Sequence, residues 1–282
     1  DAAYARRTID AQLSGLDAMM ARADGKIRRV TTVDEIEAAR RDAVFSIVLH
    51  LEGAEAIDAD LDGLARLYSR GLRSLGPVWS RPNIFGHGVP FAYPRSPDTG
   101  PGLTDAGKAL VKACNELGIM LDAAHLNERG FWDLVALSTA PIVVTHACAH
   151  AVCPATRNLT DRQLDAVKAS GGVVGFNFSV SEVRPDGHSD PDAPIETVAD
   201  HLGYLVERMG DDHVALGSDF DGAVMPRPLR DASHLQNLIQ ALRGRGFDDA
   251  TLRKIGFDNW MRVLQIGRAS WREKREEGVV RV

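Results

Sequence analysis

Two hydrophobic periods alternate along the chain. Residues 44–51 form a nearly continuous apolar and β-branched run, which is typical of a strand buried on both faces. Thr32 and Glu35 match a capping box, which predicts a helix that ends near Arg41. Further helices are predicted over 3–22, 58–70, 104–117, 127–138, 160–170 and 195–209, with shorter ones after 235, and further strands over 72–79, 119–125, 141–146, 172–178 and 214–219.

Six predicted strands, each followed by a helix, indicate a parallel α/β fold, which we expect to form one domain over residues 1–282. An open doubly wound sheet and a (β/α)8 TIM-type barrel both suit this alternation. No glycine-rich nucleotide-binding fingerprint follows the first strand, so the barrel is favoured.

Composition narrows the range of partners. The 282 residues include 33 Lys and Arg against 39 Asp and Glu, a net charge of −6 without a basic stripe, which argues against nucleic acid and anionic membranes. No apolar run approaches the roughly 18 residues that span a bilayer. Three scattered cysteines exclude a disulfide scaffold and a thiolate zinc site. The cytoplasm and the periplasm both remain open as compartments.

Four predicted strands end in residues of the kinds that bind metals, namely Glu52, His125, His146 and Asp219. Each one alone is more often a loop, cap or turn residue. Active sites of barrels are built at the carboxyl ends of several strands, however, so the four together predict a joint site. A carboxylate with two imidazoles suits zinc, and Asp219 is placed to accept a proton from a metal-bound water.

The motifs resemble those of the membrane (renal) dipeptidase family, zinc-dependent barrel enzymes of the amidohydrolase type. The similarity extends from about residue 40 to residue 265, and it depends on the order of the motifs because each is weak alone. The motifs are Leu51-Glu52-Gly53, Leu121-Asp122-Ala123-Ala124-His125, Val144-Thr145-His146, Arg157-Asn158-Leu159-Thr160-Asp161 and Gly217-Ser218-Asp219-Phe220-Asp221-Gly222.

This resemblance implies hydrolysis of a dipeptide by a hydroxide that bridges two zinc ions. It implies that Glu52 bridges the ions, that His125 and His146 complete one of them, and that Asp219 acts as the acid/base. Arg157 is implied to grip the free carboxylate of the dipeptide, since a planar guanidinium matches a carboxylate bidentately. An exposed salt bridge and a helix cap are the alternatives for Arg157.

Two positions depart from the family's pattern. The resemblance implies a substrate-binding His at the end of the second predicted strand, where this sequence has Trp79, whose indole donates a hydrogen bond but carries no proton. It also implies a His-x-Asp pair on a first barrel strand as ligands of the second zinc. The one such pair is His188-Ser189-Asp190, in a proline-rich segment that we expect to be a loop. Because a closed barrel of this type needs eight strands, we expect the first two strands and their ligands to be missing from this chain.

Three functions therefore stand beside one another. The first is a zinc dipeptidase that takes a small dipeptide, with a homodimer as a further expectation. The second is a related amidohydrolase that acts on lactams or N-acyl amino acids with the same metal site. The third is a non-catalytic truncated product that holds one metal or none.

Overall fold

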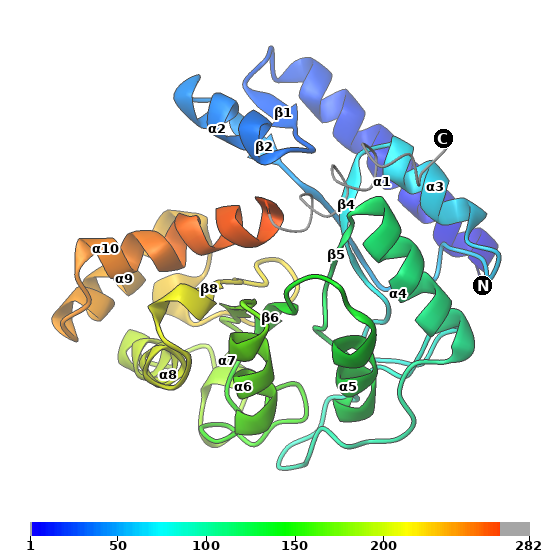
Figure 1. Ribbon diagram of the computed structural model, residues 1–282. Coiled ribbons are helices and arrows are strands. Elements are labelled where there is room, and N and C mark those ends of the chain that lie inside the picture. Colours follow the sequence, from blue (N-terminus) through cyan, green and yellow to red (C-terminus); the bar gives the residue numbers. More distant parts are fainter. Residues whose placement is uncertain (1, 266–282) are drawn as a thin grey trace.

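A computed structural model of the protein describes residues 2–265. Helices lie outside an arc of strands (Figure 1), and every pairing between the strands of this part of the chain is parallel. The strands are β1 (Ile27–Arg29), β2 (Phe45–Ile47), β3 (Leu49–Glu52), β4 (Leu72–Gly76), β5 (Met120–Leu121), β6 (Val143–Ala147), β7 (Val173–Phe176) and β8 (Val214–Leu216).

The predicted long helices are confirmed, with ends that shift by up to four residues. The capping box of Thr32 and Glu35 is present, and the helix that it opens ends at Arg41. The α-helices are α1 (Ala2–Arg22), α2 (Val33–Arg41), α3 (Asp62–Ser69), α4 (Asp105–Leu117), α5 (Glu128–Leu137), α6 (Asp161–Ala169), α7 (Val180–Val183), α8 (Ile195–Met209), α9 (Leu235–Gly244) and α10 (Asp249–Arg253). Short helical turns of other types are η1 (Asp211–His213), η2 (Arg227–Leu229), η3 (Ala232–His234) and η4 (Lys254–Asp258).

The strands pair in chain order, as a TIM-type barrel requires. One sheet has the order β3-β4-β5, another β6-β7-β8, and a single parallel bridge between Asp122 and Val143 joins them. β1 pairs with β2. No pairing closes the sheet into a complete barrel within residues 2–265, and residue 1 and residues 266–282 of the predicted domain lie outside the described part.

The prediction of one continuous strand over 44–51 is wrong, because the structure has two strands there. The segment divides at Val48 into β2 and β3, and β2 pairs with β1, which the hydrophobic pattern does not predict. β1 escaped prediction because it is three residues long and two of them are arginines. β5 is also shorter than predicted, because the chain turns away after Leu121, where the Asp122 carboxylate accepts a hydrogen bond from the Ala124 N–H.

Apolar side chains from the strands and from the inner helix faces form the core. All four residues of β7 are buried, and Phe131, Phe176 and Phe178 are fully inaccessible. Leu110, Leu134 and Leu164 contribute the buried faces of α4, α5 and α6. Because this interior is packed, polar side chains gather at the carboxyl ends of the strands, where the predicted site lies.

Candidate metal centre and substrate cleft

Three potential metal ligands from separate parts of the sheet lie in mutual contact. Glu52 ends β3, His146 lies in β6, and His125 follows β5 by four residues. Glu52 Oε1 is 2.9 Å from His125 Nε2 and 3.2 Å from His146 Nε2, and the two nitrogens are 3.0 Å apart. Within residues 2–265, this is the one group of three or more such side chains whose ligand atoms converge within 4.8 Å. The convergence expected of these residues is therefore present.

The chemistry of these atoms fits a divalent cation. One carboxylate oxygen and two imidazole nitrogens are the donor set that zinc prefers. Each ring is held from its far side, since Ser80 Oγ lies 2.7 Å from His125 Nδ1 and Thr145 Oγ1 lies 2.8 Å from His146 Nδ1. Hydrogen bonds of this kind at Nδ1 are usual behind metal-binding histidines and leave Nε2 available for the ion.

The surroundings shift the ionisation of all three groups. Burial alone would raise the pKa of Glu52, but the hydrogen bonds from His125 and His146 outweigh it and hold that pKa well below its usual range. Burial, aided by the positive charge of Arg157, lowers the pKa of His125 to about 3. Burial also opposes the charged form of His146, but its contact with Glu52 prevails and raises the His146 pKa. His125 is therefore a neutral imidazole at neutral pH, the form that binds metals.

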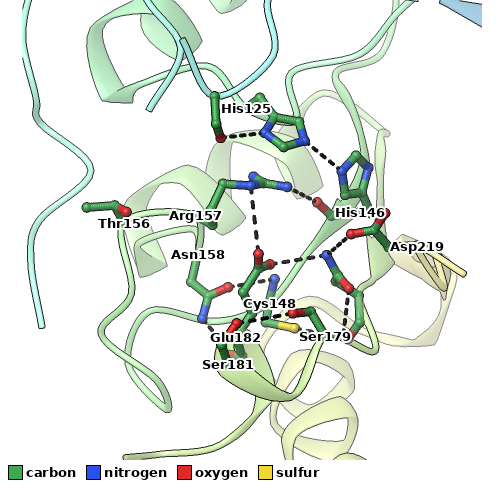
Figure 2. A network of polar contacts seen from close by, with 12 residues as sticks. His125, His146, Cys148, Thr156, Arg157, Asn158, Ser179, Ser181, Glu182 and Asp219 are labelled. Atoms are coloured by element: carbon green, nitrogen blue, oxygen red, sulfur yellow. Dashed lines mark hydrogen bonds and ion pairs between the residues drawn. The ribbon is translucent and has the colours of Figure 1, made fainter. Parts of the chain in front are cut away.

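His125 and Asp219 share an unusual backbone conformation. Both have a left-handed backbone, with φ of 65° and 58°, which is uncommon for residues other than glycine and concentrates at functional sites. Asn177 Nδ2 donates a hydrogen bond to Asp219 Oδ2 over 3.2 Å. Figure 2 shows the Asp219 carboxylate beside His146, so the structure places the predicted acid/base next to a candidate metal ligand.

Arg157 is buried rather than exposed, with 4% of its surface accessible. Its Nη2 donates to the backbone carbonyl of His146 over 3.2 Å, and its Nε lies 3.8 Å from Glu182 Oε1 (Figure 2). Burial raises the pKa of Glu182, although the charge of Arg157 counteracts this. The alternative of an exposed salt bridge for Arg157 is therefore wrong, and a buried pair takes its place.

A cleft of about 200 Å³ opens beside this pair. Its lining includes Phe91, Tyr93, Thr156, Arg157, Ser181 and Glu182. Trp79 contacts Phe91 at a centroid distance of 5.5 Å and the ring of His125 at 5.8 Å. Phe91 is 60% exposed. Aromatic rings therefore stand between the cleft and a candidate metal ligand, and the substrate-binding role of Trp79 stays a prediction.

Four polar residues of this region received no role from sequence. Asp122 hydrogen-bonds Thr145, which lies behind His146, and Asn177 and Glu182 link Asp219 to Arg157. Asp122 and Thr145 stand inside motifs of the family resemblance, which was the available signal, whereas nothing around Glu182 marks it. His188 and Asp190 lie in an exposed loop, as predicted.

Comparison with known proteins identifies the family. The sequence profile of the membrane dipeptidase family, peptidase family M19, matches residues 1–276. The chain belongs to this family. A Klebsiella pneumoniae relative, described as "Uncharacterized protein in pqqA 5′region", is 47% identical over 254 residues, which are 90% of this chain and 94% of the relative. A Schizosaccharomyces pombe relative, described as an uncharacterized dipeptidase, is 35% identical over 212 residues, 73% of this chain and 49% of its own length.

Solved structures agree with the family and the fold. A Rhodobacter sphaeroides metallo peptidase, liganded with a phosphinate mimic of the dipeptide L-Ala-D-Ala, is 49% identical, with a TM-score of 0.93 over 95% of this chain and 76% of that one. The probable dipeptidase PvdM of Pseudomonas aeruginosa shares the fold at 22% identity, with a TM-score of 0.87 over 95% of this chain and 81% of that one. No helix in the described part of the chain is both long and apolar enough to cross a membrane.

Proposed function

We propose that the protein is a zinc-dependent dipeptidase whose ion is held by Glu52, His125 and His146. The convergence of Glu52 Oε1 and the two Nε2 atoms within 3.2 Å carries this proposal. A bound zinc ion supplies a Lewis acid and lowers the pKa of a water molecule into the neutral range. The structure of the Rhodobacter relative with a dipeptide mimic supports a dipeptide as the substrate.

The other side chains act on protons and on the substrate. Asp219 accepts a proton from the attacking water and delivers it to the leaving amine, and Asn177 orients its carboxylate. Arg157 binds the free carboxylate of the dipeptide from the cleft, and its bond to the His146 carbonyl keeps it beside the metal group. Trp79 packs against Phe91 of the cleft lining and against the ring of His125, and it offers its indole N–H to the substrate.

The number of ions that this chain holds is part of the proposal. Residues 2–265 contain one converging ligand group, and their His188-x-Asp190 pair is on an exposed loop. We therefore expect about one zinc per chain. The family resemblance implies a second ion, held jointly by Glu52. Elemental analysis after reconstitution counts the ions directly, and a chain that retains no zinc contradicts the proposal.

A substrate panel tests the reaction. We expect zinc-dependent release of two amino acids from L-Ala-D-Ala or L-Ala-L-Ala and no comparable turnover of lactams or N-acyl amino acids. The reverse preference would support the related amidohydrolase instead. We expect Asp219→Asn to lower kcat by about 10²–10⁴-fold without loss of bound zinc. His188→Gln, in the exposed loop, is the matched control and should leave both unchanged.

The role of Arg157 has its own test. Arg157→Met should raise KM for dipeptides far more than KM for an amide without a free carboxylate, because the guanidinium recognises that group. An equal loss on both substrates contradicts this role. A homodimer and a cytoplasmic or periplasmic location remain predictions from the sequence.

A further inference from the structure

Behind the candidate metal ligand His146, the Thr145 hydroxyl contacts the imidazole ring, and the buried Asp122 carboxylate contacts that hydroxyl. Asp122 is 1% exposed, and its Oδ2 is 2.6 Å from Thr145 Oγ1. The same Thr145 Oγ1 is 2.8 Å from His146 Nδ1. The opposite ring nitrogen, His146 Nε2, faces Glu52. The chain of contacts therefore runs from Asp122 through Thr145 to the imidazole and on to the metal position.

The direction of each hydrogen bond follows from the supply of protons. The Asp122 carboxylate accepts the Ala124 N–H and the Thr145 N–H at Oδ1, over 2.9 Å and 2.8 Å, so it acts only as an acceptor. The single hydroxyl proton of Thr145 is then committed to Asp122 Oδ2. Thr145 Oγ1 can only accept from the ring, so His146 Nδ1 must carry a proton. In the metal-free chain Nε2 can carry a second proton towards Glu52, and when that proton leaves, the one at Nδ1 stays and Nε2 is the nitrogen with the lone pair.

We propose that Asp122 and Thr145 are positioning residues that fix the tautomer of His146 and thereby prepare its Nε2 for a metal ion. The proposal rests on the proposed function in one respect, namely that the prepared lone pair receives zinc. Neither residue belongs to the converging ligand group of Glu52, His125 and His146. Hydrogen bonds behind metal-binding histidines commonly change metal affinity by about 10–100-fold when they are removed.

The other histidine of the group provides an internal contrast. His125 Nδ1 is 2.7 Å from Ser80 Oγ, and a serine hydroxyl either donates or accepts. Among the described residues, no second hydrogen bond of the Ser80 hydroxyl fixes its direction. The hydrogen bonds at Nδ1 thus require a proton on that nitrogen of His146 but not on that of His125.

An amide in place of the carboxylate should reverse the network. In Asp122→Asn, the side-chain oxygen must stay at Oδ1, because the N–H groups of Ala124 and Thr145 require an acceptor there. The new NH2 group then donates to Thr145 Oγ1, and the Thr145 hydroxyl turns its proton towards His146 Nδ1. The ring must then move its own proton to Nε2, into the metal position. A nearly isosteric change therefore blocks the site through the tautomer alone.

Four variants of the full chain separate this relay from general damage. Thr145→Ser keeps the hydroxyl, and Thr145→Val removes it at nearly constant shape. Asp122→Asn reverses the relay, and the double variant Asp122→Asn/Thr145→Val removes the hydroxyl that transmits the reversal. Melting temperatures identify any variant that fails to fold. If Asp122→Asn fails to fold, the comparison of Thr145→Ser with Thr145→Val still tests the proposal.

The first readout is the tautomer in metal-free protein. Nitrogen-15 NMR of histidine-labelled chain distinguishes protonated from bare ring nitrogens, and the His146 signals are assigned by their loss in His146→Asn. We expect protonated Nδ1 in the wild type and in Thr145→Ser, protonated Nε2 in Asp122→Asn, and a mixture in both variants that carry Thr145→Val. Protonated Nδ1 in a folded Asp122→Asn variant would overturn the proposal.

The second readout is zinc affinity by competition with a chelator. We expect Asp122→Asn to bind zinc about 10–100-fold more weakly, Thr145→Ser to match the wild type, and the double variant to bind more tightly than Asp122→Asn alone. A double variant that is weaker than both single variants contradicts a relay. A wild type with the expected tautomer that binds no zinc supports the relay and refutes the proposed function, so the two failures are distinguishable.

Discussion

Gly175, in the middle of β7, has space for no side chain at all. A Cβ atom there would lie 1.9 Å from the carbonyl oxygen of Thr145, and a Cβ on Gly217 would lie 2.0 Å from the same oxygen. The pairing of β6 with β7 shifts register between Val144 and Ala147, so the ladder is irregular at the candidate ligand His146. Strand irregularities of this kind re-aim side chains near active sites. The two glycines therefore give the Thr145 carbonyl the space in which this irregularity forms.

The size of the clash sets the cost of Gly175→Ala. Real Cβ contacts are at least 3.0 Å, so the Thr145 carbonyl would have to move by about 1.1 Å. The atoms in contact are backbone and cannot rotate away as a side chain would. Overpacking of a core costs about 1–3 kcal/mol, and we expect the upper end of that range here. About 3 kcal/mol corresponds to a melting temperature lower by about 6–12 °C for a domain approaching this size.

Thermal unfolding followed by circular dichroism measures the effect. Gly203→Ala is the matched control, because Gly203 lies in α8 with nothing within 4 Å of its added Cβ. This control should stabilise the protein by about 0.5–1 kcal/mol, as alanine does in a helix. Zinc affinity should fall in Gly175→Ala and remain unchanged in Gly203→Ala, since His146 follows Thr145. A Gly175→Ala protein that melts within about 1 °C of the wild type would refute the reasoning.

Two further predictions concern buried charge. Glu182→Gln should lower the free energy of unfolding, measured in urea, by about 3–5 kcal/mol, because Arg157, 3.8 Å away, loses its buried counter-ion. The double variant Arg157→Met/Glu182→Met should be more stable than Glu182→Gln. A loss below about 1 kcal/mol in Glu182→Gln contradicts a charged pair. Burial lowers the pKa of His201 from 6.5 to about 4, so between these pH values the folded state binds fewer protons than the unfolded state. The free energy of unfolding therefore falls as the pH drops from 6.5 to about 4, by about 3 kcal/mol in total. His201→Gln can keep both bonds of the ring, to the Ala149 N–H and the Val183 carbonyl, and should lack this decline; equal slopes for both proteins would exclude His201 as its source.

The sequence alone determined the main elements and the three candidate ligands that converge. Apolar periodicity along an element records which of its faces is buried, and this pattern is local, so the long helices and most strands could be read from it. Glu52, His125 and His146 could be proposed because parallel strands bring their carboxyl ends to one edge. β1 could not be read, because two of its three residues are arginines and its strand character comes from pairing with β2.

Only the tertiary structure decided what supports those ligands. Asp122 and Thr145 are 23 residues apart, and their contact exists because β5 and β6 lie side by side with a particular register. Arg157, in a loop, and Glu182, in α7, likewise meet from separate segments, and burial removes their contact from water. A sequence lists which residues can bond, but hydrogen-bond direction, burial and close backbone approach depend on distances between strands, which no local pattern encodes.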